Sequence, residues 1–175
     1  MAGEVRDGGA SNTFVIIDPA SFEKEAIGCA ARQFSEVLER SGFTEVKEIS
    51  CGKEQCGVMI EGMNKDGVYT RFYMGKRART FWVSWHFALA KNIIPANGFL
   101  RSAVSEANEC DVSWLSFRID RANETVVARA YATDPHGIGY LDFVAHQYEE
   151  LLDTLRDSDL AEYLKLPAAI VKKIR

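Results

Sequence analysis

The feature that most constrains the fold is a change of hydrophobic period after residue 42. From residue 43 to residue 89, apolar and polar side chains alternate with a period of two, which is typical of strands with one buried face. Short turn sequences, such as Asn64-Lys65-Asp66-Gly67, separate the alternating stretches. Short connections join antiparallel neighbours, because a parallel pair needs a crossover of about a dozen residues or more. We therefore predict four antiparallel strands, at Thr44–Ser50, Gly57–Met63, Val68–Gly75 and Thr80–Leu89.

Before and after these strands in the sequence, apolar residues recur at helical spacing. Asp18-Pro19-Ala20-Ser21 predicts the start of a first helix with Ser21 as its N-cap, and Gly42 predicts its end. Two more helices are predicted at Gly98–Glu109 and Tyr140–Arg156. Two further strands are predicted between them, at Val112–Asp120 and Thr125–Thr133. The predicted order is α-ββββ-α-ββ-α, an α+β fold in which helices cover an antiparallel sheet of about five to six strands.

The chain reads as one domain. Its length of 175 residues suits a single core, and no stretch between the predicted elements has the composition of a linker. Residues 1–12 are rich in Gly, Ala, Ser and Asn and are predicted to be a flexible tail. We predict a single α+β domain over residues 13–166, followed after Pro167 by a basic C-terminal helix over residues 167–175.

Three stretches resemble the YbjN-like family of bacterial proteins. They are the glycine turn that ends the first helix, Val37-Leu38-Glu39-Arg40-Ser41-Gly42-Phe43, the pair Ala107-Asn108 before a strand, and the last strand pair leading through Asp134 into the long helix. The resemblance implies the fold of type III secretion chaperones. It also implies a non-enzymatic role in protein–protein contact, chaperoning or regulation, often as a dimer.

Strand alternation assigns one side of the predicted sheet to the core. That side carries large apolar residues in the earlier strands and small ones in the last strand, where a helix can approach closely. Its members are Phe81, Val83, Trp85, Phe87, Leu89, Leu115, Phe117, Ile119, Val126, Ala128, Ala130 and Ala132.

The opposite side is rich in tyrosine, tryptophan and arginine, the residue types that dominate binding energy in protein interfaces. An ordinary solvent face would instead carry Lys, Glu, Thr and Ser. We predict a partner-binding surface made of Tyr69, Arg71, Tyr73, Trp82, His86, Trp114, Arg118, Arg129 and Tyr131. The alternative is a second hydrophobic layer, covered by Thr13–Ile17 or by the C-terminal helix.

No catalytic or metal-binding motif stands out. Cys51 and Cys56 have a spacing that a metal site could use, but a structural zinc needs four ligands and no second pair accompanies them. Asp142 and His146 share a helix face near Asp134 and His136, yet Asp142 also suits the first helical turn. We predict no enzyme activity, no metal, no cofactor, and four reduced cysteines.

The distribution of basic residues leaves nucleic-acid binding as an alternative function. The basic residues Arg71, Lys76, Arg77 and Arg79 lie beside aromatics, and single-stranded nucleic acids bind to such surfaces. However, 21 basic and 25 acidic residues give a net charge of −4, so nucleic-acid binding is the less favoured prediction. No apolar run is long enough to span a membrane, and the N-terminus lacks a signal pattern. We therefore expect a cytoplasmic protein. From the aromatic and arginine residues of the outer side and from the family resemblance, we expect it to bind a protein partner and to form a homodimer.

Overall fold

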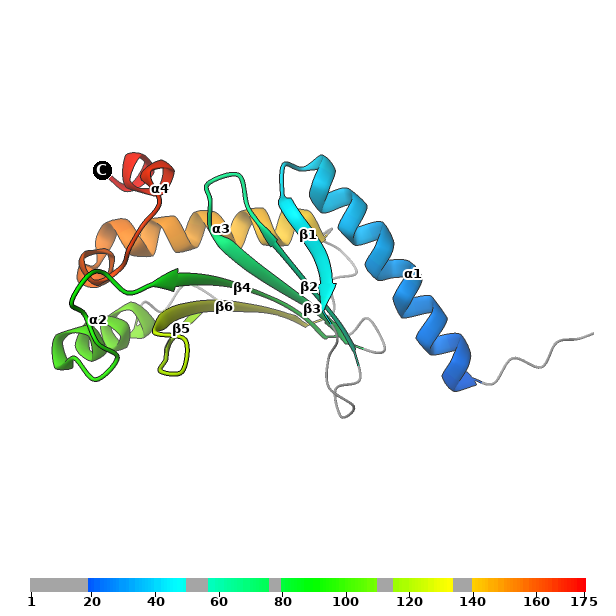
Figure 1. Cartoon of the computed structure of the whole chain (residues 1–175), viewed down its shortest axis with the longest axis horizontal. Helices are drawn as coiled ribbons and strands as arrows, with labels where there is room; N and C mark the ends of the chain where they lie inside the picture. Colours follow the sequence, from blue (N-terminus) through cyan, green and yellow to red (C-terminus); the bar gives the residue numbers. More distant parts are fainter. Residues whose placement is uncertain (1–18, 50–56, 76–79, 110–114, 134–139) are drawn as a thin grey trace, which may run out of the picture.

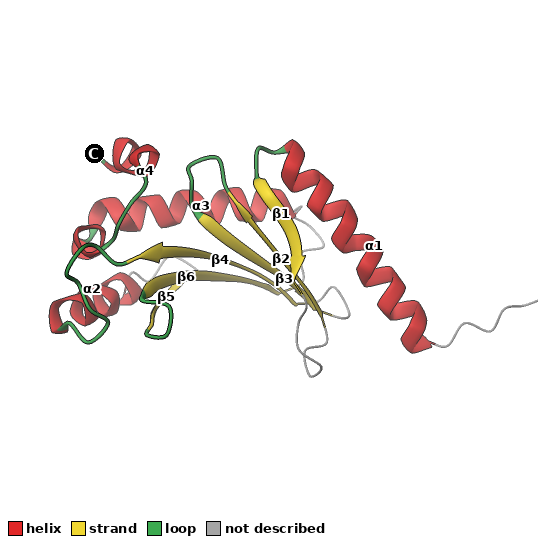
Figure 2. Cartoon of the chain, in the orientation of Figure 1, coloured by secondary structure: helices red, strands yellow, loops and turns green. Residues whose placement is uncertain are grey.

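The computed structural model describes residues 19–49, 57–75, 80–109, 115–133 and 140–175. Its helices are α1 (Pro19–Arg40), α2 (Gly98–Glu109), α3 (Tyr140–Asp157), the 3-10 helix η1 (Asp159–Tyr163) and α4 (Ala168–Ile174). Its strands are β1 (Thr44–Ile49), β2 (Gly57–Met63), β3 (Tyr69–Gly75), β4 (Thr80–Ala88), β5 (Leu115–Asp120) and β6 (Thr125–Thr133). Figure 2 distinguishes the two kinds of element by colour.

The six strands form one antiparallel sheet in the order β1-β2-β3-β4-β6-β5. This arrangement confirms the predicted α+β fold and the order of its elements. The last two strands lie in the sheet in the reverse of their order in the sequence, because β6 lies beside β4 and leaves β5 at the edge. The predicted N-cap at Ser21 is wrong, since α1 already begins at Pro19, where the fixed φ of proline suits a first helical turn.

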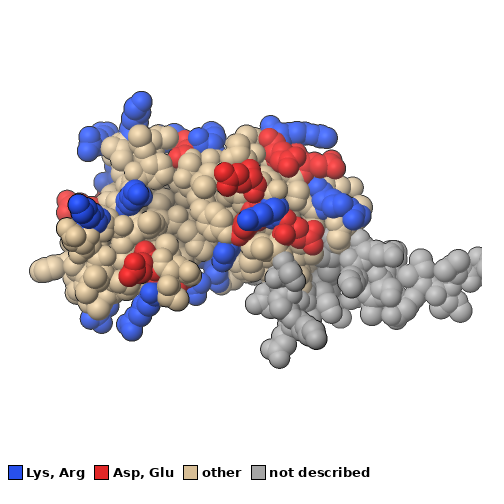
Figure 3. Space-filling model, viewed as in Figure 1, with Lys and Arg blue, Asp and Glu red and all other residues tan. Residues whose placement is uncertain are grey.

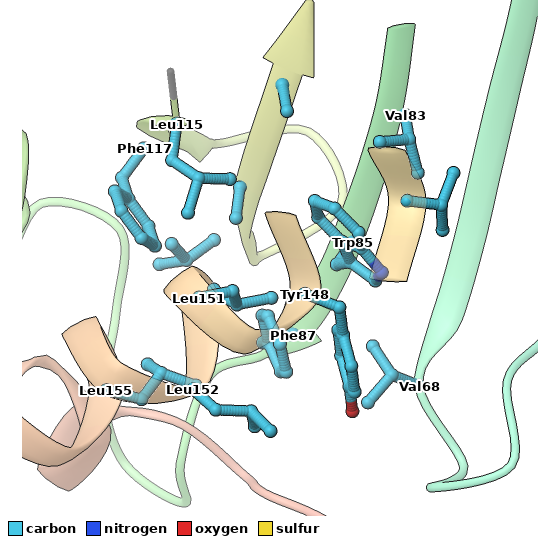
Figure 4. Packing of buried hydrophobic residues seen from close by; sticks show 14 of the residues in the cluster. Val68, Val83, Trp85, Phe87, Leu115, Phe117, Tyr148, Leu151, Leu152 and Leu155 are labelled. Carbon is cyan, nitrogen blue, oxygen red and sulfur yellow. The ribbon is translucent and has the colours of Figure 1, made fainter. Parts of the chain in front are cut away.

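The helices bury their apolar stripes against one side of the sheet. In Figure 1, α3 runs lengthwise along the sheet and α1 lies beside β1. Figure 4 shows Leu151, Leu152 and Leu155 of α3 in one cluster with Trp85 and Phe87 of β4. All four α-helices contribute to this one core, which contains every residue predicted for the inner side, with Leu89, Ile119 and Ala132 partly buried at its margin.

Asn108 fixes the helix-to-strand junction that contributes to the family resemblance. Its side-chain amide donates to the carbonyl oxygen of Phe117 at 2.9 Å and accepts from the Phe117 N–H at 2.7 Å. The asparagine thus pairs with the outer edge of β5 as a neighbouring strand would. Satisfying these edge groups also holds α2 against β5.

The C-terminal helix returns to the same core. Ile170 of α4 is fully buried, and Lys173 donates to Asp66 in the β2–β3 turn at 2.6 Å. Tyr148 of α3 donates to the same carboxylate at 2.9 Å, so Asp66 joins three separate elements. Because α4 packs on the side of the sheet that α3 covers, the C-terminal helix does not cover the opposite side. The other predicted cover, Thr13–Ile17, lies outside the described residues.

We predict that Asp66→Asn destabilises the fold by about 1–3 kcal/mol at pH 7, because it removes a buried charge-assisted hydrogen bond. Burial opposes ionisation of Asp66, but Lys173 and Tyr148 outweigh it and hold its pKa below the ordinary value of 3.8. The stabilisation is therefore present above pH 3.8 and is lost as the pH falls through the lowered pKa. Urea unfolding at pH 7 and pH 2.5 measures both effects.

The matched control is Lys172→Met, which changes an exposed lysine of α4 next to Lys173, the partner of Asp66. A free energy of unfolding that falls equally in both variants at pH 7 would contradict the role of Asp66.

Candidate partner-binding site

The side of the sheet opposite the core brings together eight of the nine predicted binding residues. Strand pairing places Trp82 between Tyr73 and Tyr131, and it places Ser84 between Arg71 and Arg129. His86 pairs with Tyr69 on one side and Val127 on the other, and Val127 pairs in turn with Arg118. We call this surface the aromatic–arginine face: Tyr69, Arg71, Tyr73, Trp82, His86, Arg118, Arg129 and Tyr131. Trp114, the ninth residue, lies outside the described residues.

A ladder of planar groups crosses this face from β3 to β6. The rings of Tyr73 and Trp82 are stacked, with centroids 5.5 Å apart and planes 16° apart. The guanidinium carbon of Arg129 lies 4.2 Å from the centroid of the Trp82 ring, which is a cation–π contact. Arg129 also donates through Nη1 to the hydroxyl of Tyr131 at 3.2 Å. These contacts hold the side chains of the ladder against one another.

A second group of contacts neutralises Arg71. The buried carboxylate of Glu61 on β2 accepts from Lys47 at 2.9 Å, and it lies 3.4 Å from Nε of Arg71. The hydroxyl of Tyr69 donates to Glu61 and accepts from Arg71. Burial opposes ionisation of Glu61, but the hydrogen bonds from Tyr69 and Lys47 hold its pKa below the usual value. Glu61 is therefore ionised, and its negative charge pairs with Arg71, one of the three arginines of the face.

The middle of the face holds a serine–histidine pair. The Ser84 hydroxyl lies 3.0 Å from Nε2 of His86. Ser84 is fully buried beneath its larger neighbours, so its hydroxyl is inaccessible to a substrate and does not serve as a nucleophile in this arrangement. Burial lowers the pKa of His86 to about 4, with further contributions from Arg71, Arg129 and Arg118. The imidazole is therefore neutral at pH 7.

A pocket of about 440 Å³ opens above this pair. Three arginines, a neutral histidine and two stacked rings line it, together with a methionine and an aspartate: Arg71, Arg118, Arg129, His86, Tyr73, Trp82, Met59 and Asp120. Asp120 is engaged in the following turn, where it accepts from the backbone N–H groups of Ala122 and Asn123 and from the Asn123 side chain. Such a pocket offers guanidinium donors beside aromatic surface.

The sequence prediction missed three residues of this site. Met59 and Asp120 line the pocket, and Glu61 pairs with Arg71. Along β2, Met59 and Glu61 point to the side of the sheet opposite that of Val58 and Ile60. This alternation could have indicated Met59 and Glu61 as residues of the site. Asp120 has the same parity as Arg118 in β5 and could have been assigned in the same way.

The other predicted candidates form no site among the residues that the structure describes. Asp142 and His146 are both exposed on α3, and Cys29 is exposed on α1. Within the described part of the chain, no group of three or more His, Cys, Asp or Glu residues could hold a metal ion. Cys51, Cys56, Cys110, Asp134, His136, Lys76, Arg77 and Arg79 lie outside the described residues. None of the described helices is both long enough and apolar enough to cross a membrane.

Comparisons with known proteins give a likeness of fold. No family model matches the sequence, and no curated protein matches it. Among solved structures, the chain is similar to YbjN from E. coli, a candidate transcription regulator, with 15% sequence identity and a TM-score of 0.49. The likeness covers 78% of this chain and 93% of that one. This structure bears the name of the family that the sequence resembles, and the likeness concerns the fold alone.

We predict that His86 makes the protein less stable in mild acid. Its pKa is about 4 in the folded chain and its ordinary value is 6.5, so the unfolded chain binds the proton more readily. Stability therefore falls as the pH drops from 6.5 toward 4, by about 2 kcal/mol at pH 5. Thermal or urea unfolding at pH 7.5 and pH 5 measures this loss.

His86→Gln removes the titrating group and is expected to lose less stability than the wild type between the two pH values. His146→Gln, which changes an exposed histidine of α3, is the control and keeps the loss. Equal losses in the wild type and His86→Gln would show that the prediction is wrong.

Proposed function

We propose that this chain is a protein-binding module of chaperone-like or regulatory type rather than an enzyme, and that it binds through the aromatic–arginine face. The observation that carries the proposal is a set of tyrosine, tryptophan and arginine side chains on the side of the sheet opposite the core. None of these eight residues belongs to the described hydrophobic core. Large aromatic and guanidinium groups outside the core are the residue types that supply most binding energy in protein interfaces.

The contacts within the face support this role. Stacking fixes Tyr73 against Trp82, and the cation–π contact fixes Arg129 against the same ring. Side chains that are already ordered lose little conformational entropy when a partner binds. Tyr131, which is 45% exposed, lies at the end of this ladder and offers a further ring for contact. The face thus combines preorganised aromatic area with hydrogen-bond donors.

Charge favours a protein partner over a nucleic acid. Glu61 neutralises Arg71, and the carboxylate of Asp120 lines the pocket beside Arg118. On the side of the molecule shown in Figure 3, basic and acidic side chains are interspersed over the described surface. A phosphate backbone binds best along a continuous basic track, and its affinity falls steeply with salt. Fluorescence anisotropy with oligo(dT) at low and high salt tests this alternative.

We further propose that a second copy of the chain can occupy the face, so that the protein self-associates. We predict that Trp82→Ala weakens this association by about 2 kcal/mol or more, because Trp82 is the large ring that stacks on Tyr73 and carries the cation–π contact of Arg129. Since Trp82 lies outside the core cluster, its removal should cost the free energy of unfolding only its stacking and cation–π contacts, about 0.5–2 kcal/mol, and leave the fold intact. Sedimentation equilibrium and thermal unfolding give the two measurements.

Trp85→Ala provides the matched control. Trp85 is three residues along the same strand, points into the core and is fully buried, so its removal should cost about 3–5 kcal/mol of stability. A melting temperature for Trp82→Ala as low as that of Trp85→Ala, with unchanged association, would refute the assignment of the face. A wild-type chain that stays monomeric at all concentrations would refute self-association.

A further inference from the structure

We propose that the pocket on the aromatic–arginine face binds a carboxylate, presented by a glutamate or aspartate of an acidic segment in a partner protein, and that Arg118 and Arg129 are its ligands. The inference rests on the proposed protein-binding function and specifies the chemistry of the partner. It is carried by two guanidinium groups that line the pocket without a carboxylate partner among the described residues.

Arg129 has a hydrogen-bond donor without a partner. Its Nε is buried and has no hydrogen-bond partner in the described structure, although its Nη1 donates to Tyr131. A buried donor without a partner costs free energy, and a carboxylate that draws the guanidinium group toward the pocket recovers this cost by giving the donor a partner. The contact with the Trp82 ring holds the guanidinium plane in place. An ordered guanidinium can accept a carboxylate with two parallel hydrogen bonds.

Arg118 supplies the second charge. It is exposed at the edge strand β5, and no described carboxylate lies within ion-pair distance of its guanidinium group. The third arginine, Arg71, is already paired with Glu61. Asp120 is the one acidic residue that lines the pocket, and its oxygens accept hydrogen bonds from its own turn. Arg71, Arg118 and Arg129 against the carboxylates of Glu61 and Asp120 therefore leave the described part of the pocket with a net positive charge.

The surroundings favour a single carboxylate on a peptide. The Tyr73 and Trp82 rings and Met59 give apolar contact for the methylene groups of an acidic side chain and for its neighbours. Glu61, on the other side of Arg71, interrupts the basic surface that a polymer of phosphates would follow.

The test is an NMR titration of the full chain with a synthetic decapeptide of Gly and Ser that carries Trp and three Glu at its centre. We expect saturable shifts of the Arg118 and Arg129 Nε–Hε signals, and at least tenfold weaker binding of the same peptide with Gln in place of Glu. Arg118→Gln and Arg129→Gln should each weaken binding of the Glu peptide at least fivefold. Arg32→Gln, at an exposed site on α1, should leave it unchanged.

Two comparison ligands test the choice of partner. A phosphoserine version of the peptide, or oligo(dT), that binds at least tenfold more tightly than the Glu peptide would overturn the assignment to a carboxylate. Equal binding of the Glu and Gln peptides would overturn it too, and would leave the protein-binding face intact. Absence of binding at millimolar Glu peptide would also overturn it. The self-association of wild-type and Trp82→Ala chains tests the proposed function separately, because it requires no acidic peptide.

Because Arg129 packs on Trp82, its replacement could disturb the face. Arg118→Gln is free of this difficulty, since Arg118 is exposed. Unchanged binding by folded Arg118→Gln and Arg129→Gln chains would overturn the proposed ligands. Arg129→Lys, which keeps the charge and loses the planar fork, should retain part of the affinity.

Discussion

The pleat of β4 is the constraint on which the rest of the structure depends. Successive side chains along a strand point to opposite sides, so Phe81, Val83 and Trp85 fill the core while Trp82, Ser84 and His86 point away from it. A slip of one residue in pairing would bury a histidine and expose the core tryptophan. The large difference in burial free energy between the two registers, of several kcal/mol, fixes one of them. The aromatic–arginine face is thus a direct consequence of how the core is built.

A sheet face with this many rings needs contacts that keep its side chains ordered. In this chain the face orders itself through stacking between Tyr73 and Trp82, through the cation–π contact of Arg129, and through hydrogen bonds among Glu61, Tyr69 and Arg71. Each contact is worth about 0.5–2 kcal/mol, so together they can restrain side chains that water would otherwise leave mobile. Order of this kind is also what a binding surface requires.

The sequence was sufficient to predict the strands, the order of the elements and the side of the sheet on which each face residue lies. Alternation and short turns are local signals, and the large apolar set of Phe81 to Phe87 leaves little ambiguity about the inner side. The pocket could not be predicted in the same way. Arg118 reaches the neighbourhood of His86 only because β6 inserts between β4 and β5, and Val127 is the residue that separates them. That strand order depends on long-range packing, which no local pattern encodes.

The start of α1 shows the same limit on a smaller scale. Ser21 matches the preferences of an N-cap, and Pro19 suits the first turn of a helix, so one short sequence supports two starting points. The structure takes the earlier one. Capping preferences differ by about 1 kcal/mol, which is too little to decide a boundary when neighbouring residues offer comparable signals.

His86 links the electrostatics of the face to the proposed ligand. Its proton is disfavoured by burial and then by Arg71, Arg129 and Arg118, which face it from β3, β6 and β5, while Asp120 of β5 acts in the opposite direction. Tyr69 contacts its ring from β3, and Ser84 shares a hydrogen bond with it from β4. A carboxylate held between Arg118 and Arg129 adds a negative charge near the imidazole and offsets part of the repulsion. The pKa of His86 therefore rises when such a ligand binds, and by reciprocity protonation of His86 strengthens binding. The strengthening begins as the pH falls through the raised pKa of His86 in the ligand-bound chain and is complete near pH 4, the pKa of His86 in the free chain, where the ligand carboxylate itself begins to be protonated.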